Sequence, residues 1–120
     1  MKKALCIGSL NIDYVYRVDH INRPGETQTA LRMDVFPGGK GLNQSIALAK
    51  AGARIYMAGM VGSDGDFLLS AGKSYGVNIE LIQKIDGKSG HSIIQVDKNG
   101  QNSIVIYGGT NRCLSKEYID

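Results

Sequence analysis

The alternation of short apolar runs with helical patterns over the first two thirds of the chain most constrains its fold. Residues 4–7 form an apolar run closed by glycine and serine, which is typical of a buried parallel strand. Within residues 41–51 apolar side chains recur at helical spacing, and Gly52 supplies a natural end. A second strand is predicted at residues 55–61 and a second helix at residues 66–75. This order predicts an α/β fold with a parallel sheet and crossover helices.

Several further strands are predicted outside this alternation. Residues 14–18 alternate and are rich in β formers, and residues 27–35 are predicted as another strand. Residues 79–85, 92–96 and 104–107 follow as short strands without helices between them. The second part of the chain therefore departs from the βα order.

The dipeptide of Asn99 and Gly100 indicates a hairpin between the last two strands, because both central residues of a tight primed turn need positive φ. A two-residue turn would pair Ile94 with Val105. A bulge residue would instead bring Ile94 and Ile106 to one face of the sheet. The residues alone leave both registers open.

Composition excludes several classes of protein. The chain has 120 residues, enough for one domain, with 42% apolar and 21% charged residues. Its net charge of +3 comes without a basic run or interleaved aromatic residues, which argues against nucleic-acid binding. No apolar stretch is long enough for a membrane span or a signal peptide, so we expect a cytoplasmic protein. Cys6 and Cys113 are isolated, and we expect both to be reduced and structural.

The segment GSLNID at residues 8–13 places two polar side chains after the first predicted strand. Asn11 and Asp13 are two residues apart and project to the same side of an extended backbone. An amide and a carboxylate on one side suit a grip on vicinal hydroxyls, and ligand sites in open α/β sheets lie at the carboxyl ends of strands. The alternative is an Asx turn that links two strands.

The segment GGKGLNQS at residues 38–45 is a second candidate site. It matches neither the Walker loop nor the dinucleotide fingerprint, which would need glycine in place of Gln44. What remains is a glycine-rich loop that opens a helix, where backbone amides favour anions or oxygen acceptors. Asn43 lies in the first turn of that helix and can reach a ligand there. The alternative is that the glycines only permit a tight turn.

Three remaining features are interpreted as structural. Residues 62–66 (GSDGD) lack the further oxygen ligands of a calcium site, so a capped turn into the next helix is predicted. His20 and His91 have no acidic or cysteine neighbours at catalytic spacing, and we treat both as incidental. Ser115 is a candidate N-cap of a helix that the chain only begins, which suggests the front part of a longer protein.

Together these residues resemble the ribokinase-like branch of the PfkB carbohydrate kinases over residues 4–111. The most specific match is the family's first signature, which covers residues 38–45 together with Gly52 and Gly62. The segments GSLNID and YGGTN also lie where the family has equivalent short motifs. The resemblance implies that residues 1–120 form the N-terminal part of a ribokinase-like parallel-sheet sandwich with a small β lid.

The resemblance also implies an activity, which is ATP-dependent phosphorylation of a sugar hydroxymethyl group with Mg²⁺, with ribose as the favoured sugar. The lid would comprise residues about 14–35 and 92–107. Lids of ribokinases pair between two subunits, so a homodimer is implied. The lid register of the family requires the bulged hairpin, which we therefore favour.

The resemblance assigns roles to particular residues of this chain. Asn11 and Asp13 would hydrogen-bond sugar hydroxyls, and Lys40 would also lie near the transferred phosphoryl group. Backbone amides of the glycines before Lys40 would face the sugar. The full set of implied sugar-binding residues is Asn11, Asp13, Gly38, Gly39, Lys40, Asn43, Ser92, Ile94 and Ile106.

The chain departs from the family in two respects. After Phe67, the glycine usual in the family's G-x-D-x-x-G motif is replaced by Leu68, which concerns only the local helix start. The family's catalytic aspartate, its oxyanion-stabilising helix end and its ATP pocket belong to a C-terminal half beyond residue 120. We therefore expect no catalytic base here, and no turnover by this chain alone. The alternative function is a free-standing, non-catalytic sugar-binding or dimerisation module.

Overall fold

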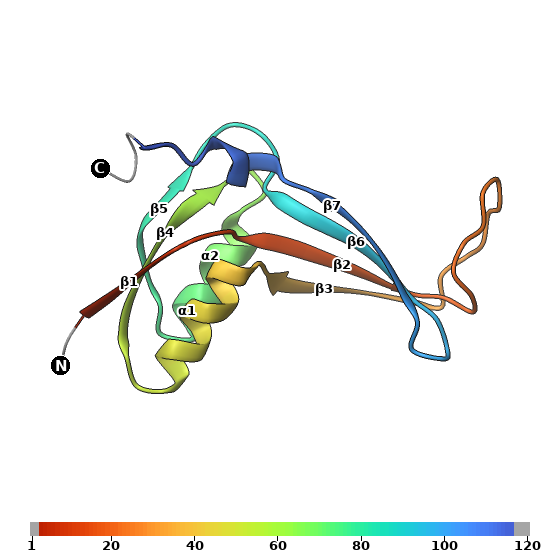
Figure 1. Cartoon of the computed structure of the whole chain (residues 1–120), viewed down its shortest axis with the longest axis horizontal. Helices are drawn as coiled ribbons and strands as arrows, with labels where there is room; N and C mark the ends of the chain where they lie inside the picture. The colour runs from red at the N-terminus through yellow and green to blue at the C-terminus, as the bar shows by residue number, and fades with distance from the viewer. Residues whose placement is uncertain (1–2, 117–120) are drawn as a thin grey trace.

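The computed structural model describes residues 3–116 and shows two sheets, two helices and a 3₁₀ turn (Figure 1). The first sheet is parallel, in the order β1-β4-β5. Its strands are β1 (Lys3–Ile7), β4 (Arg54–Val61) and β5 (Asn78–Lys84), and the helices between them are α1 (Lys40–Lys50) and α2 (Asp66–Ser74). The predicted α/β alternation is confirmed. The ends of β1, α1, β4 and α2 differ from the predicted ends by no more than one residue.

The second sheet has four strands and extends away from the helices along the 51 Å axis of the molecule (Figure 1). Its order is β3-β2-β6-β7, with β2 and β6 parallel and the outer pairs antiparallel. The strands are β2 (Asn11–Arg17), β3 (Arg32–Gly38), β6 (Gly90–Val96) and β7 (Asn102–Tyr107), and the 3₁₀ turn η1 (Gly109–Cys113) follows. The chain thus enters this sheet twice, once after β1 and once after β5.

The strand predicted at residues 27–35 is displaced in the structure, where β3 starts at Arg32 and continues to Gly38. The preceding residues form a loop held by side-chain bonds, including one from Gln28 Nε2 to the His20 carbonyl oxygen at 2.7 Å. Propensity alone missed this boundary because the Gln28 side chain bonds another part of the loop. The Leu31 N–H donates to the Arg17 carbonyl of β2 at 2.7 Å, directly before β3 begins.

The core lies between the parallel sheet and the two helices. Leu42 of α1, Leu68 of α2 and Met57 of β4 are fully buried in it. Burial of each such side chain contributes roughly 1.5–3 kcal/mol. Leu68 is the residue at which the sequence departs from the G-x-D-x-x-G motif. This departure does not move the start of α2, which begins at Asp66 as predicted.

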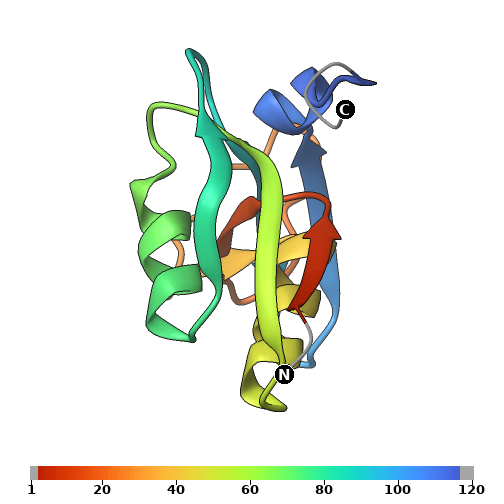
Figure 2. The same ribbon diagram turned by 90° about the vertical axis from the view of Figure 1, so that its left-hand side faces the viewer.

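The opposite face of the parallel sheet is open, which corrects the prediction of a buried first strand. Cys6 faces the helices, but Leu5 is 57% and Ile7 41% exposed. Among residues 3–116 no helix lies over this face, as Figure 2 shows. The apolar sequence of β1 is typical of a strand with helices packed on both faces of its sheet. The sequence of the strand alone does not show on which faces helices lie.

The two sheets join at residues 8–10, against the start of α1. A Cβ added to Gly41 would lie 2.6 Å from the carbonyl carbon of Gly8, so only glycine permits this backbone contact. The Leu42 N–H donates to the Ser9 carbonyl at 3.1 Å, and Leu10 is fully buried. The first turn of α1 is therefore fixed directly beside the entrance to β2.

The β6–β7 hairpin has the bulged register. Ser92 pairs with Ile106 and Ile94 pairs with Ile104, so Ile94 and Ile106 share a face as favoured. Gly100 has φ +81°, and no described residue other than glycine has positive φ, so the turn is not the primed two-residue type that would pair Ile94 with Val105. The Gly100 N–H bonds the Asp97 carbonyl at 3.0 Å, which is a type I turn closed by a glycine bulge.

Several smaller predictions have clear outcomes. Both cysteines are free, but only Cys6 is buried, so a structural role for the exposed Cys113 is wrong. Asp64 does not cap α2, because its carboxylate accepts the Ser89 N–H at 2.8 Å and no side chain caps that helix.

The helix expected after Ser115 falls largely on residues 117–120, outside the described residues. No helix in the described range 3–116 is long and apolar enough to cross a membrane.

Candidate functional site

A cavity of about 450 Å³ lies between the start of α1 and one face of the four-stranded sheet. Eight of the nine sugar-binding residues expected from the sequence line it, and Gly38 is the exception. Ser9 and Ile104 line it as well and were not expected. The complete lining is Ser9, Asn11, Asp13, Gly39, Lys40, Asn43, Ser92, Ile94, Ile104 and Ile106.

Asp13 on β2 is held by its neighbour on β6. The Ser92 hydroxyl donates to Asp13 Oδ1 at 2.6 Å, and Ser92 is only 4% exposed. This bond uses one of about four lone-pair positions on the carboxylate, so Asp13 keeps acceptor capacity for a ligand. Gly38 lies directly behind it, because a Cβ at position 38 would overlap Asp13 Oδ2.

Asn11, the other β2 residue with a polar side chain in the cavity lining, is bonded by Asn111 of η1, which the sequence did not identify as a site residue. Asn111 Nδ2 donates to Asn11 Oδ1 at 2.7 Å and to the Leu10 carbonyl at 3.1 Å. Asn111 Oδ1 accepts the Leu10 N–H at 3.0 Å. The YGGTN segment was noted as a motif, but its contact with a residue 100 positions away has no local signal.

The start of α1 forms the electropositive side of the cavity. Gly39 has φ +94°, and a Cβ there would lie 2.7 Å from the Ser9 carbonyl oxygen. Lys40 is the first residue of the helix, and the Asn43 N–H donates to the Gly39 carbonyl at 2.9 Å. A helix N-terminus with an ammonium group attracts anions and oxygen acceptors.

The opposite wall is apolar and comes from the hairpin. Ile94, Ile104 and Ile106 line it, and the last two are 51% and 68% exposed. Ile104 is the cross-strand partner of Ile94. Once the bulged register is known, Ile104 is therefore expected on the same face of the sheet as Ile94. The cavity therefore has polar groups on one side and aliphatic groups on the other, a combination typical of small-molecule sites.

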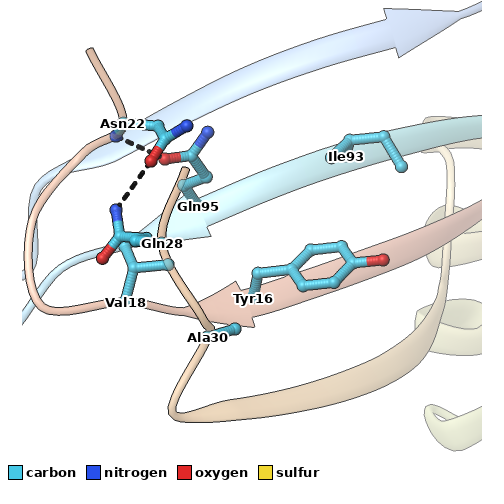
Figure 3. A pocket seen from close by; sticks show the side chains of 7 residues that line it. All are labelled: Tyr16, Val18, Asn22, Gln28, Ala30, Ile93 and Gln95. Carbon is cyan, nitrogen blue, oxygen red and sulfur yellow. Dashed lines mark hydrogen bonds between the residues drawn. The ribbon is translucent and has the colours of Figure 1, made fainter. Parts of the chain in front are cut away.

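A second cavity of about 230 Å³ lies at the far end of the four-stranded sheet, on its other face (Figure 3). Its amide groups bond one another: the Asn22 N–H donates to Gln95 Oε1 at 2.8 Å and Gln28 Nε2 donates to Asn22 Oδ1 at 3.0 Å. None of the expected site residues lines it. The larger cavity is the better candidate because its polar groups keep unused bonding capacity.

Two histidines lie outside the larger cavity. His20 contacts Asp19 Oδ2 at 3.1 Å and Glu26 Oε1 at 2.7 Å, which corrects the view that it has no acidic neighbours. Hydrogen bonds to Asp19 and then Glu26 raise the pKa of His20 above its usual value. His91 packs edge-on against Tyr14, and its Nδ1 lies 2.9 Å from the Ser89 carbonyl oxygen, a structural role.

Comparison with known proteins gives consistent matches. The family model described as pfkB family carbohydrate kinase matches residues 1–119. Ribokinase from Haemophilus influenzae is 37% identical over 120 residues, which cover 97% of this chain and 39% of that protein. The chain spans about two fifths of the length of such relatives.

Solved structures agree with the fold. Ribokinase from Thermotoga maritima superposes with a TM-score of 0.90 and 40% identity, covering 98% of this chain and 40% of that one. Arabidopsis thaliana ribokinase, complexed with ribose and ATP, has a TM-score of 0.82 and 31% identity, covering 91% and 36%. The prediction of the N-terminal part of a ribokinase-like fold is confirmed. Because the family match extends over nearly the whole sequence, this chain belongs to the pfkB family of carbohydrate kinases.

Proposed function

We propose that the protein containing this chain transfers a phosphoryl group from ATP to a hydroxymethyl group of a sugar, with ribose as the favoured substrate. In this proposal the chain provides the sugar site and its lid. One observation carries the proposal: Asn11, Asp13, Lys40 and Asn43, from two separate segments, converge on one cavity beside a helix N-terminus. The relatives named above are ribokinases, which makes a pentose the first candidate.

The polar groups of the cavity match the chemistry of a polyol. A sugar hydroxyl both donates and accepts, so it needs an acceptor and a donor close together. The Asp13 carboxylate supplies acceptors, and the amides of Asn11 and Asn43 supply both functions. The aliphatic wall of Ile94, Ile104 and Ile106 would cover the C–H face of the sugar and keep water from it.

Lys40 would serve the phosphoryl group. It begins α1, so its ammonium group adds to the partial positive charge of the helix N-terminus. Phosphoryl transfer depends mainly on positioning and on stabilising charge that spreads over the equatorial oxygens. A cation at the edge of the sugar cavity is suited to that task.

Mg²⁺ at phosphoryl-transfer sites is usually held by one or two carboxylates together with substrate phosphates. Within residues 3–116 no group of three or more His, Cys, Asp or Glu side chains could hold a metal ion. ATP, when bound, supplies the phosphoryl group, and we propose that its site and that of Mg²⁺ lie mostly outside this chain. We assign no catalytic base to this chain.

The four-stranded sheet is proposed as a lid that pairs with a second copy. Strands β3 and β7 form the edges of this sheet. Both edge strands carry exposed apolar side chains, such as Met33 and Val35 on β3 and Val105 on β7. Such exposed apolar surface is typical of an interface. A homodimer through the lid is expected, and sedimentation of the full-length protein at several concentrations measures it.

The experiment that tests the proposed function is an assay of ADP release by the full-length protein. Ribose, other pentoses, fructose-type sugars and nucleosides are compared at saturating MgATP. ADP release that depends on one of these substrates supports the proposal. Release with none of them contradicts it. Calorimetric binding of a sugar without any ADP release would favour the alternative, a non-catalytic sugar-binding module.

A further inference from the structure

We infer that Asn111 is a positioning residue for sugar recognition, which fixes the amide of Asn11 so that its NH₂ group faces the cavity. The inference rests on the proposed function, because it concerns how that site distinguishes sugar hydroxyls. Asn111 itself does not line the cavity, so it would act only through Asn11.

The backbone of Leu10 determines the orientation of both amides. A backbone N–H can only donate, so the atom of Asn111 that faces the Leu10 N–H at 3.0 Å must be Oδ1. The Asn111 NH₂ group then faces the Leu10 carbonyl at 3.1 Å and Asn11 at 2.7 Å. Because that NH₂ group can only donate, the Asn11 atom opposite it is the acceptor Oδ1.

The remaining half of the Asn11 amide is its NH₂ group. Within residues 3–116 this group has no hydrogen-bond partner, and no side-chain nitrogen or oxygen in that range is both buried and unpaired. The Nδ2 of Asn11, a residue of the cavity lining, is therefore accessible. Asn11 presents a donor beside the Asp13 acceptors, and the two together match adjacent sugar hydroxyls. A reversed Asn11 amide would place acceptor beside acceptor.

The position of Asn111 is set by glycine-dependent backbone packing. Gly109 has φ +54°, and a Cβ there would lie 2.7 Å from the Gly90 nitrogen. The Thr110 N–H donates to the Lys88 carbonyl at 3.0 Å, and Thr110 is buried. Gly90 also lacks a Cβ where one would overlap Asn111 Nδ2. These contacts bring η1 against the start of β6, so the Asn111 amide is pre-organised.

The test uses Asn111→Ala in the full-length kinase, with Arg112→Ala as the control on the same turn. We expect the KM and the calorimetric Kd for the sugar to rise about 2- to 10-fold in Asn111→Ala, the effect of one neutral hydrogen bond. The KM for ATP should not change. Arg112→Ala, an exposed side chain, should leave the sugar KM unchanged.

A second variant tests the orientation of the Asn11 amide. Asn111→Asp keeps an oxygen for the Leu10 N–H but puts an oxygen opposite Asn11 Oδ1, which forces the Asn11 amide to reverse. It should raise the sugar KM at least as much as Asn111→Ala. Because the new oxygen also faces the Leu10 carbonyl oxygen, the thermal midpoint should fall as well, so the sugar KM is measured at a temperature where the variant is fully folded.

A double variant completes the test. In an Asn11→Ala background, Asn111→Ala should raise the sugar KM no further. An unchanged sugar KM in both Asn111 variants, or the same rise with and without Asn11, overturns the inference while leaving the proposed function intact. If the unmodified protein neither binds nor phosphorylates any sugar, the proposed function is wrong and the inference is overturned with it.

Discussion

A methyl group at position 38 tests how the Asp13 carboxylate is held. The pairing of Gly38 with Asn11 on β2 fixes the backbone, so the new Cβ of Gly38→Ala has one position. There it overlaps Asp13 Oδ2 and lies 3.1 Å from Oδ1. The carboxylate must rotate away, and rotation breaks the 2.6 Å bond from Ser92.

The size of the effect follows from that bond. A hydrogen bond to a charged group contributes about 1.5–3 kcal/mol, which corresponds to roughly 10- to 150-fold in an equilibrium constant. Because the carboxylate also leaves its place in the cavity lining, this loss is expected in sugar binding as well as in local stability. We therefore expect Gly38→Ala to raise the Kd for ribose by roughly 10- to 150-fold.

Calorimetry on the full-length protein measures this Kd, and ADP release gives kcat/KM in parallel. The matched comparison is Gly38→Ala in an Asp13→Ala background, where no carboxylate remains to be displaced. There the methyl group should change affinity by less than about 2-fold. An equal loss in both backgrounds would refute the reasoning, and so would parental affinity in Gly38→Ala alone.

Three further predictions concern single contacts. Ser92→Ala removes a donor to Asp13 and should raise the sugar Kd about 10-fold, and an unchanged Kd in calorimetry contradicts it. Gly41→Ala brings a Cβ within 2.6 Å of the Gly8 backbone and should lower the free energy of unfolding by about 1–3 kcal/mol in urea titrations, whereas a change below about 0.5 kcal/mol contradicts it. His20, whose raised pKa exceeds its usual 6.5, stabilises the loop at residues 19–31 when protonated. That stabilisation is complete below about pH 6.5 and is lost as the pH rises through the raised pKa, so amide exchange in the loop, corrected for intrinsic rates, should speed up across this window in the parent but not in His20→Ala.

Local patterns sufficed for much of the candidate site. The two-residue spacing of Asn11 and Asp13 placed both on one face, whereas Ser92 and Ile94 were expected at the site only from the family resemblance. Gly52 ends α1 with φ +92°, as its position after a helical pattern predicted. Each of these signals depends only on neighbours within a few residues, which is why the sequence contains it.

The bonds that join the site residues to one another depend on long-range packing. Asn111 meets Asn11 across 100 positions, and Ser92 meets Asp13 across 79. Neither bond leaves a periodic trace in the sequence. The turn at Asn99 has the dipeptide of a primed turn but the geometry of a bulge, because the flanking strands, rather than the dipeptide, set the loop length.

The construction of the cavity assigns different tasks to its two sides. Asn11 and Asp13 are bonded by Asn111 and Ser92, so under the proposed function the polar side would discriminate sugars by the order of donors and acceptors. The aliphatic side is different, since Ile106 is 68% exposed and gains burial only when a ligand or another surface covers it. We therefore propose that the polar side discriminates between sugars and that the aliphatic side closes over them. Truncation of Ile106 to alanine should weaken all sugars alike, whereas changes at Asn111 should alter their ranking.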